Sequence, residues 1–186
     1  MDEQTLHKLM IDLGALKKGH YLRTSGRHSD TYVQPAKLFQ SASMAESVAA
    51  PLAKHFEGMG AQLVLGAALG GVLAGYEVSR ALNLPYIFSE RKDGAMTLRR
   101  GFTISPGSKV LLIEDEVQTG TSVREMTEIV RALGGEVVGI GCIVDKSGGK
   151  LRFEAPFKAL LSIPVTHYSS QDCPLCKEGI EMEPSP

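Results

Sequence analysis

The chain of 186 residues contains no tryptophan, only three cysteines and almost no net charge. Three cysteines are too few for a scaffold held together by disulfides. A formal charge of −1 at pH 7 gives no electrostatic attraction to nucleic acid or to an anionic membrane surface, so we expect neither as a partner. No apolar run approaches the roughly 18 residues of a membrane span, and the polar N-terminus does not resemble a signal peptide. These absences favour a cytoplasmic enzyme or binding protein.

Short apolar stretches alternate with amphipathic ones along the chain. This alternation predicts one α/β domain with a parallel sheet and right-handed crossovers. The polar, turn-rich residues 19–32 are expected to be irregular. Strands are predicted at 62–66, 86–89, 109–115, 137–144 and 159–163, and helices at 3–13, at 44–56, from the 67–71 turn to about residue 82, and along the stripe Val123, Met126, Val130 and Leu133 that ends at Gly134.

The most informative stretch covers residues 110–122. Residues 110–113 (Val-Leu-Leu-Ile) form a continuous apolar run, which predicts a buried parallel strand. Glu114 and Asp115 follow at its carboxyl end, where open α/β sheets bind ligands. The Thr-Gly-Thr-Ser turn at 119–122 then opens a helix, and its N–H groups and hydroxyls favour a phosphate. An acid pair beside such a cradle suits a sugar phosphate, because the acids can accept hydrogen bonds from ribose hydroxyls.

Two other interpretations of this stretch stay open from the residues alone. A strand that ends in acids also occurs in receiver domains and nucleotide hydrolases, and the Thr-Gly-Thr-Ser turn could serve only as a helix cap. The chain has no Gly-x-x-x-x-Gly-Lys-Ser/Thr motif, which argues against the usual P-loop hydrolase.

Residues 113–122 resemble the signature of the type I phosphoribosyltransferase family, whose members bind 5-phosphoribosyl-1-diphosphate (PRPP). Residues 19–32 are similar to the Ser-Gly-Arg segment of its orotate branch, and residues 90–102 and 172–176 are similar to the mobile loop and tail of the longer bacterial form. The resemblance implies a parallel-sheet, Rossmann-like core with a small hood formed by terminal segments. Residues 1–186 would then be a single phosphoribosyltransferase domain, with 1–35 and about 164–180 in the hood and 181–186 as a tail.

The resemblance also implies what residues 114–122 and the turn at 68–71 bind. Glu114 and Asp115 would hold the ribose hydroxyls and favour the positive charge that develops as diphosphate leaves. The turn at 68–71 (Ala-Leu-Gly-Gly) suits a close approach of backbone to diphosphate, although it also fits a plain strand-to-helix turn. Mg²⁺ is the expected cofactor, carried mainly by PRPP oxygens with no protein ligand firmly assigned. The expected PRPP-binding residues here are Glu114, Asp115, Glu116, Val117, Gln118, Thr119, Gly120, Thr121, Ser122, Leu69 and Gly70.

Four basic residues flank the Asp93-Gly94 turn: Arg91, Lys92, Arg99 and Arg100. They are candidates for a mobile lid that neutralises diphosphate and excludes water, with Arg91 and Lys92 binding PRPP and Arg99 and Arg100 taking a catalytic part. A solvated surface hairpin is the alternative. In the family such a loop reaches the neighbouring subunit's site, so the resemblance implies a homodimer.

Three residues depart from the family's pattern, and two of them, Gln118 and Lys146, stand where the base should lie. Gln118 replaces a Ser or Thr that contacts orotate in relatives, and Lys146 stands where a base-binding arginine is usual. A glutamine amide can pair with a pyrimidine edge, and a lysine can neutralise a carboxylate without the two-pronged contact of arginine. Glu116 adds a third carboxylate, for which a solvated position, a metal contact and an effect on a neighbour's pKa all stay open.

The cysteines indicate no firm site. Cys142 lies in an apolar strand and is expected in the core. Cys173 and Cys176 have the spacing of a metal knuckle, but His167 is the nearest histidine, and one histidine with two thiols makes an incomplete zinc site. Reduced thiols or a local disulfide are the preferred interpretation.

The leading hypothesis is a magnesium-dependent orotate phosphoribosyltransferase, a glycosyltransferase of pyrimidine nucleotide biosynthesis. It would take PRPP and orotate as partners and release orotidine 5-phosphate and diphosphate. The alternatives are a phosphoribosyltransferase for a different nucleobase, which Gln118 and Lys146 motivate, and a PRPP-binding regulatory protein without turnover.

Overall fold

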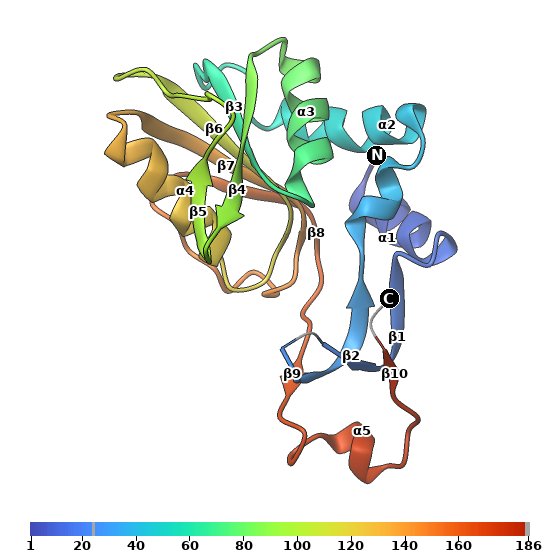
Figure 1. Cartoon of the computed structure of the whole chain (residues 1–186). Helices are drawn as coiled ribbons and strands as arrows, with labels where there is room; N and C mark the ends of the chain where they lie inside the picture. Colours follow the sequence, from blue (N-terminus) through green and yellow to red (C-terminus); the bar gives the residue numbers. More distant parts are fainter. Residues whose placement is uncertain (24, 185–186) are drawn as a thin grey trace.

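A computed structural model describes residues 1–23 and 25–184. These residues form a six-stranded sheet with the order β5-β4-β3-β6-β7-β8 and a four-stranded sheet with the order β10-β1-β2-β9 (Figure 1). In the larger sheet all neighbours pair in parallel except β4 and β5, which form a hairpin. Its strands are β3 (Leu63–Ala67), β4 (Tyr86–Lys92), β5 (Ala95–Leu98), β6 (Lys109–Val117), β7 (Glu136–Asp145) and β8 (Phe157–Ser162).

The central strand β6 shows how the larger sheet is buried on both faces. Leu111 and Ile113 belong to one apolar cluster, which includes side chains of α2 (Ala42–Lys54) and α3 (Gly71–Leu82). Val110 and Leu112 point the other way, into a cluster with α4 (Thr121–Ala132). Since successive strand residues face opposite sides, a continuous apolar run is what a strand between two helical layers requires. The helices on the two faces therefore hold the carboxyl end of β6 in place.

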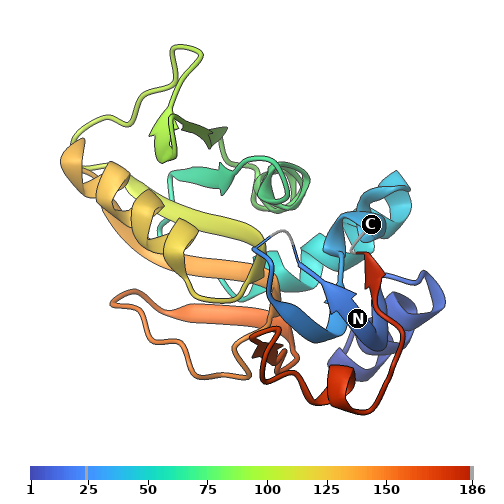
Figure 2. The same ribbon diagram turned by 60° about the horizontal axis from the view of Figure 1, so that its bottom comes forward.

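The smaller sheet joins the two ends of the chain (Figure 2). Its centre is the antiparallel pair of β1 (Leu16–Leu22) and β2 (His28–Val33). The C-terminal segment adds β9 (His167–Tyr168) beside β2 and β10 (Glu183–Pro184) beside β1, with the short helix α5 (Pro174–Lys177) between them. The helices α1 (Glu3–Asp12) and η1 (Pro35–Phe39) link this sheet to the core. The predicted α/β core with a hood of terminal segments is confirmed.

Four local predictions differ from the structure. Residues 19–32, expected to be irregular, form most of β1 and β2; a register shift between Lys18 and Tyr21 breaks the alternation that would have revealed them. Strand β4 extends to Lys92 because it pairs with β5. Leu133 is the C-cap of α4 and is 37% exposed, so it is not part of the inner stripe. The expected tail at 181–186 is partly a strand, since Glu183 and Pro184 pair with β1, while residues 185–186 lie outside the described residues.

Within residues 1–23 and 25–184, we find no helix with the length and apolar character that crossing a membrane requires.

Candidate active site

Three connections that follow strands meet at one edge of the larger sheet, because β3, β6 and β7 run parallel. They are the 67–71 turn after β3, the 114–122 segment at the end of β6, and the 145–149 loop after β7. The Lys146 N–H donates to the Val117 carbonyl at 2.8 Å, which joins the 145–149 loop to the end of β6. Within that loop, the Asp145 carboxylate accepts from the N–H groups of Ser147 and Gly149 at 2.8 and 2.9 Å. A Cβ added at Gly70 would lie 2.4 Å from Oδ2 of Asp115, so the 67–71 turn lies against the same strand end. The predicted meeting of these loops is therefore what the structure shows.

The acid pair at the end of β6 is buried. Glu114 is 7% exposed and Asp115 is 8% exposed. Desolvation raises the pKa of Glu114 to about 8, with the negative charge of Asp115 as the second cause. Desolvation also raises the pKa of Asp115 to about 6, and the charge of Glu116 adds to this effect. Two buried carboxylates of raised pKa favour a ligand that brings positive charge or hydroxyl donors.

The turn between β3 and α3 packs directly against these carboxylates. A Cβ placed on Gly70 would collide with both carboxylate oxygens of Asp115, and one on Gly71 would lie 2.9 Å from Oε2 of Glu114. Gly70 has a helical backbone, with φ −58° and ψ −48°, so its conformation suits any residue. Glycine is therefore required at position 70 because a larger side chain would collide with Asp115, and not because of the backbone conformation. The Leu69 side chain is 87% exposed at the same turn.

The connection from β6 to α4 forms a small hollow at the start of a helix. Gly120 has φ +76° and precedes the first residue of α4, a left-handed conformation that favours glycine. The Thr119 and Thr121 hydroxyls lie 2.9 Å apart, and the Arg124 guanidinium donates to the Thr119 carbonyl at 2.7 Å. The hollow measures about 160 Å³ and is lined by Glu114, Glu116, Val117, Gln118, Thr119, Gly120, Thr121, Ser122 and Val123.

This hollow combines polar hydroxyls with the N-terminus of a twelve-residue helix. The leading N–H groups of a helix have no intrahelical partner, and the helix dipole adds partial positive charge there. Such an arrangement binds an anion, a phosphate above all. The side chain of Val117 is buried in the core, so this residue can offer a ligand only its backbone.

A larger cavity of about 790 Å³ separates the hood from the core edge. On the hood side it is lined by Tyr32 of β2 and by Arg23, which directly follows β1. On the core side it is lined by Asp115 and Glu116 of β6 and by Leu69 of the turn after β3. Another hollow of about 1010 Å³, beside α4 and β7, contains neither acid of the pair. Because Asp115 faces the cavity and Glu114 faces the phosphate-sized hollow, the acid pair connects two binding spaces of different size.

The residues that depart from the family pattern lie together at this junction. Lys146 is 3% exposed, and its ammonium is 2.6 Å from Oε1 of Glu116. Gln118 donates weakly to the carbonyls of Lys146 and Val165, at 3.4 and 3.5 Å. Oε1 of Gln118 and Oε2 of Glu116 are buried, and neither has a hydrogen-bond partner among residues 1–23 and 25–184. Glu116 is therefore the partner of Lys146 and also raises the pKa of Asp115, and two buried acceptors are left for a ligand.

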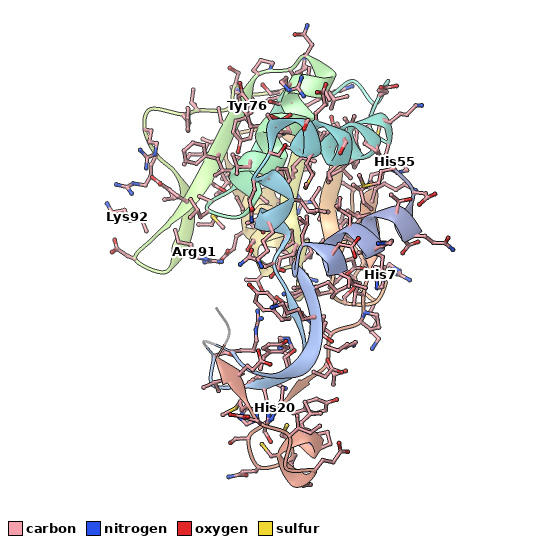
Figure 3. The ribbon with its side chains drawn as sticks, turned by 90° about the vertical axis from the view of Figure 1, so that its right-hand side faces the viewer. His7, His20, His55, Tyr76, Arg91 and Lys92 are labelled. Carbon is pink, nitrogen blue, oxygen red and sulfur yellow. The ribbon has the colours of Figure 1, made fainter. Side chains whose placement is uncertain are left out.

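The four basic residues of the expected lid do not reach the acid pair in this conformation. Arg91 pairs with Glu125 of α4 at 2.5 Å, while Arg99 and Arg100 pair with Glu90 at 3.1 and 3.0 Å. Arg91 and Lys92 lie on the β4–β5 hairpin, far from His20 at the tip of the hood (Figure 3). In the described part of the chain, none of the four lines the 790 Å³ cavity. The segment forms a hairpin here, and its closure over a ligand stays a prediction.

The structure adds Arg23 and Tyr32 to the candidate site. Both come from the hood, and sequence reasoning left them out of the site because their segment was expected to be irregular. The resemblance of residues 19–32 to a known segment was the available signal. Arg23 brings a positive charge to a cavity that otherwise presents the carboxylates of Asp115 and Glu116.

Replacing Glu114 by glutamine tests the electrostatics of the acid pair. An acid whose pKa is raised on folding holds more protons in the folded state, so its ionisation destabilises the fold as pH rises from about 4.5 to about 8. Glu114→Gln should therefore raise the Tm by several degrees at pH 8 and by little at pH 5, with each kcal/mol worth roughly 2–4 °C. Calorimetry at both pH values measures this. Glu128→Gln on the exposed side of α4 is the control, and a pH-independent Tm gain would contradict the assignment.

Comparison with known proteins shows that the chain belongs to the phosphoribosyltransferase family. Residues 37–175 match the family model of the phosphoribosyl transferase domain. The chain is 46% identical over 182 residues to the orotate phosphoribosyltransferase of Caldanaerobacter subterraneus, which covers 98% of this chain and 96% of that protein. It is 43% identical over 178 residues to the orotate phosphoribosyltransferase of Thermotoga maritima, covering 96% of this chain and 95% of the relative.

Solved structures share the fold at lower identity. The orotate phosphoribosyltransferase from Aeropyrum pernix superposes with a TM-score of 0.70 at 23% identity, over 84% of this chain and 93% of that one. The adenine phosphoribosyltransferase from Thermoanaerobacter pseudethanolicus superposes with a TM-score of 0.64 at 17% identity, over 72% of this chain and 88% of that one. One fold thus serves proteins named for two different bases, so the fold by itself does not select the base.

Proposed function

We propose, from the premise that this chain belongs to the phosphoribosyltransferase family, that it is an orotate phosphoribosyltransferase of pyrimidine nucleotide biosynthesis. It transfers the 5-phosphoribosyl group of PRPP to orotate and releases diphosphate. The observation that carries this function is the buried pair Glu114 and Asp115, which adjoins the phosphate-sized hollow at the start of α4. The similarity of nearly the whole chain to orotate phosphoribosyltransferases selects orotate among the bases.

The chemistry that we assign to these residues follows from where charge develops. The bond from ribose C1 to diphosphate breaks, and a ring nitrogen of the base forms the new bond to C1. As diphosphate leaves ahead of full bonding to the base, positive charge develops on the ribose. Glu114 and Asp115 accept hydrogen bonds from the ribose hydroxyls and stabilise this positive charge. The first turn of α4, with Thr119, Thr121 and Ser122, holds the 5-phosphate. The 790 Å³ cavity receives the base and the diphosphate.

Magnesium is proposed as the cofactor, and the donor set fits it. Glu114 and Asp115 offer buried carboxylate oxygens. Burial raises both pKa values, helped by the charge of Asp115 for Glu114 and by the charge of Glu116 for Asp115, so a nearby dication would favour their charged forms. Bound Mg²⁺ would neutralise charge on the leaving diphosphate. Since Mg²⁺ keeps several waters and binds through substrate oxygens, two carboxylates suffice on the protein side.

The basic hairpin is proposed as the lid over diphosphate. Its arginines form ion pairs with Glu90 and Glu125. Ion pairs near the surface contribute little stability, so a polyanion can replace these glutamates as the partner of the arginines. Arg99 and Arg100 would then neutralise the leaving group, and Arg91 and Lys92 would bind PRPP. The homodimer remains a proposal that rests on the family, and sedimentation of the purified chain measures it. The cytoplasmic location stays a prediction.

A panel of bases tests the activity. The purified chain is incubated with PRPP, Mg²⁺ and each base in turn, and diphosphate release is followed. We expect turnover with orotate and at least a hundredfold lower kcat/KM with adenine or hypoxanthine. Turnover with a different base alone would contradict the assignment of orotate. Binding of PRPP without turnover would contradict enzymatic function and support a regulatory protein.

Lys146→Ala tests the base site. A buried ammonium next to the cavity can neutralise the carboxylate of orotate, and a charged hydrogen bond of this kind contributes about 1.5–3 kcal/mol. We therefore expect the KM for orotate to rise about 10- to 100-fold, while the KM for PRPP changes little. Steady-state kinetics with each substrate varied separately measures both.

Glu116→Gln is the matched control for this prediction. It removes the charge that pairs with Lys146 and leaves the ammonium in place. The KM for orotate should stay the same or fall in this variant. An unchanged KM in Lys146→Ala would place the lysine outside the base site and leave Arg23 as the cation that meets the base.

A further inference from the structure

Four side chains that the proposed reaction does not use gather at the tip of the hood. His20 and His28 come from β1 and β2, and Cys173 and Cys176 come from the C-terminal segment at α5. Their nearest ligand atoms all lie within 4.8 Å of one another. His20, His28 and Cys173 are buried, at 2%, 5% and 0% exposed. All three cysteines of the chain are free thiols, so no disulfide accounts for the approach of Cys173 and Cys176.

We propose that His20, His28, Cys173 and Cys176 form a structural zinc site. The distances between ligand atoms support this assignment. Nε2 of His20 lies 3.6 Å from Sγ of Cys173 and 3.7 Å from Sγ of Cys176, and Nδ1 of His28 lies 3.3 Å from Sγ of Cys176. In a tetrahedron with Zn–S of about 2.3 Å and Zn–N of about 2.05 Å, the sulfur–nitrogen edges are about 3.6 Å. The two ring nitrogens lie 2.9 Å apart, against about 3.3 Å in that tetrahedron.

The hydrogen bond of the second ring nitrogen of His20 determines which nitrogen is free to bind a metal. Nδ1 lies 2.9 Å from the carbonyl oxygen of Ile180. A carbonyl only accepts, so Nδ1 carries the proton and donates, and the lone pair of Nε2 faces the two sulfurs. Metal-binding histidines commonly donate their other N–H to a backbone carbonyl in this way. The carbonyl belongs to the segment that follows α5, so the same contact anchors the C-terminal segment to β1.

The donor set selects the metal. Two imidazoles and two thiolates in a tetrahedral arrangement are ligands typical of Zn²⁺, while Mg²⁺ and Ca²⁺ prefer oxygen. Two thiolates and one Zn²⁺ also sum to zero charge, which lowers the cost of burying three of the four ligands; Cys176 is exposed. This metal is therefore different from the Mg²⁺ proposed at the acid pair, in both chemistry and position.

The C-terminal segment of the hood has few buried side chains to hold it against β1 and β2. Among the described residues from 169 to 183, Cys173 is the only buried one, and neither apolar core cluster includes a residue of this segment. Strands β9 and β10 are two residues each. A segment with so little apolar burial depends on a metal or a disulfide to stay ordered. Bound zinc would hold the C-terminal segment against β1 and β2, which carry Arg23 and Tyr32 to the cavity.

Metal content of the purified chain is the direct test, and it does not depend on the proposed function because no substrate is present. We expect about one zinc per chain by elemental analysis after purification without chelator. Replacement of the metal by Co²⁺ should give visible d–d bands and a near-ultraviolet thiolate-to-cobalt charge-transfer band. Cys173→Ser and Cys176→Ser should each weaken that charge-transfer band. Each should also lower the affinity for zinc by more than roughly 10- to 100-fold, which is the loss expected when a metal ligand merely loses its supporting hydrogen bond.

Matched variants separate this site from nonspecific binding. Cys142→Ala removes the thiol that lies in β7, and His55→Gln removes an exposed histidine distant from the hood (Figure 3). Both should keep one zinc per chain and the cobalt spectrum. Zinc at trace level together with no cobalt charge-transfer band would overturn the proposal. So would equal loss of metal in Cys142→Ala, or a Cys173–Cys176 disulfide found by thiol titration of the freshly purified, denatured chain.

Discussion

Replacing Asp115 by asparagine should lower kcat for orotate by about 10³-fold, since loss of one well-placed electrostatic contact to the transition state costs about 10²–10³. The carboxylate lies 8% exposed at the end of β6, where it lines the 790 Å³ cavity. Asparagine has the same shape and can still accept a hydrogen bond, so the lost quantity is the negative charge that stabilises the positive ribose. Initial rates at saturating PRPP and orotate measure the effect.

The fold should survive this change. Burial raises the pKa of Asp115 to about 6, which means that the folded protein tolerates a neutral side chain at this position better than a charged one. The Tm of Asp115→Asn at pH 8 should therefore equal or exceed that of the unchanged chain. Asp12→Asn on α1, an exposed carboxylate paired with Lys8, is the control and should keep full activity. A kcat within threefold of the original would remove Asp115 from the catalytic residues.

Adding one methyl group at Gly70 should lower kcat/KM by about 10²-fold or more. The new Cβ would lie only 2.4 and 2.5 Å from the two carboxylate oxygens of Asp115, so that carboxylate must move. Displacement of a catalytic group by about 1 Å can cost 10²-fold in rate. Gly70 already has helical φ and ψ, so alanine fits the backbone and the Tm should change little.

A double variant shows whether the effect of Gly70→Ala acts through the carboxylate. If the methyl group acts by moving Asp115, then Gly70→Ala combined with Asp115→Asn should be little worse than Asp115→Asn alone. Independent, additive losses would mean that the methyl group blocks substrate directly. Full activity in Gly70→Ala would show that the turn can shift away from β6 without consequence.

The core of the fold follows from patterns that act over a few residues. An apolar run such as 110–113 suits a strand between two helical layers, and the helices that begin after it show apolar residues at helical spacing. The acid pair at the end of that strand could be placed at the sheet edge because carboxyl ends of parallel strands share an edge. For the same reason, the proximity of the 67–71 turn and the 145–149 loop could be predicted.

The hood could be inferred from the family resemblance but not from local pattern. Buried polar residues, such as His28, Ser29 and Thr31, replace the apolar face that a strand usually shows. Their burial makes sense only with the opposing strands in place. The position of Arg23 in the cavity depends on the same pairing, and so it was absent from the predicted site.

By itself, the sequence determined the order of the parallel strands and helices of the core, the acid pair and the helix start beside it, since each depends on neighbours within about ten residues. Only the tertiary structure decided that the two pairs of possible metal ligands lie together. Cys173 and His20 are 153 positions apart, and Cys176 and His28 are 148 apart. No local periodicity connects such distant residues; pairing of β9 with β2 and of β10 with β1 brings them together. Sequence reasoning considered His167 as the histidine beside the cysteines, and the folded chain supplies His20 and His28 instead.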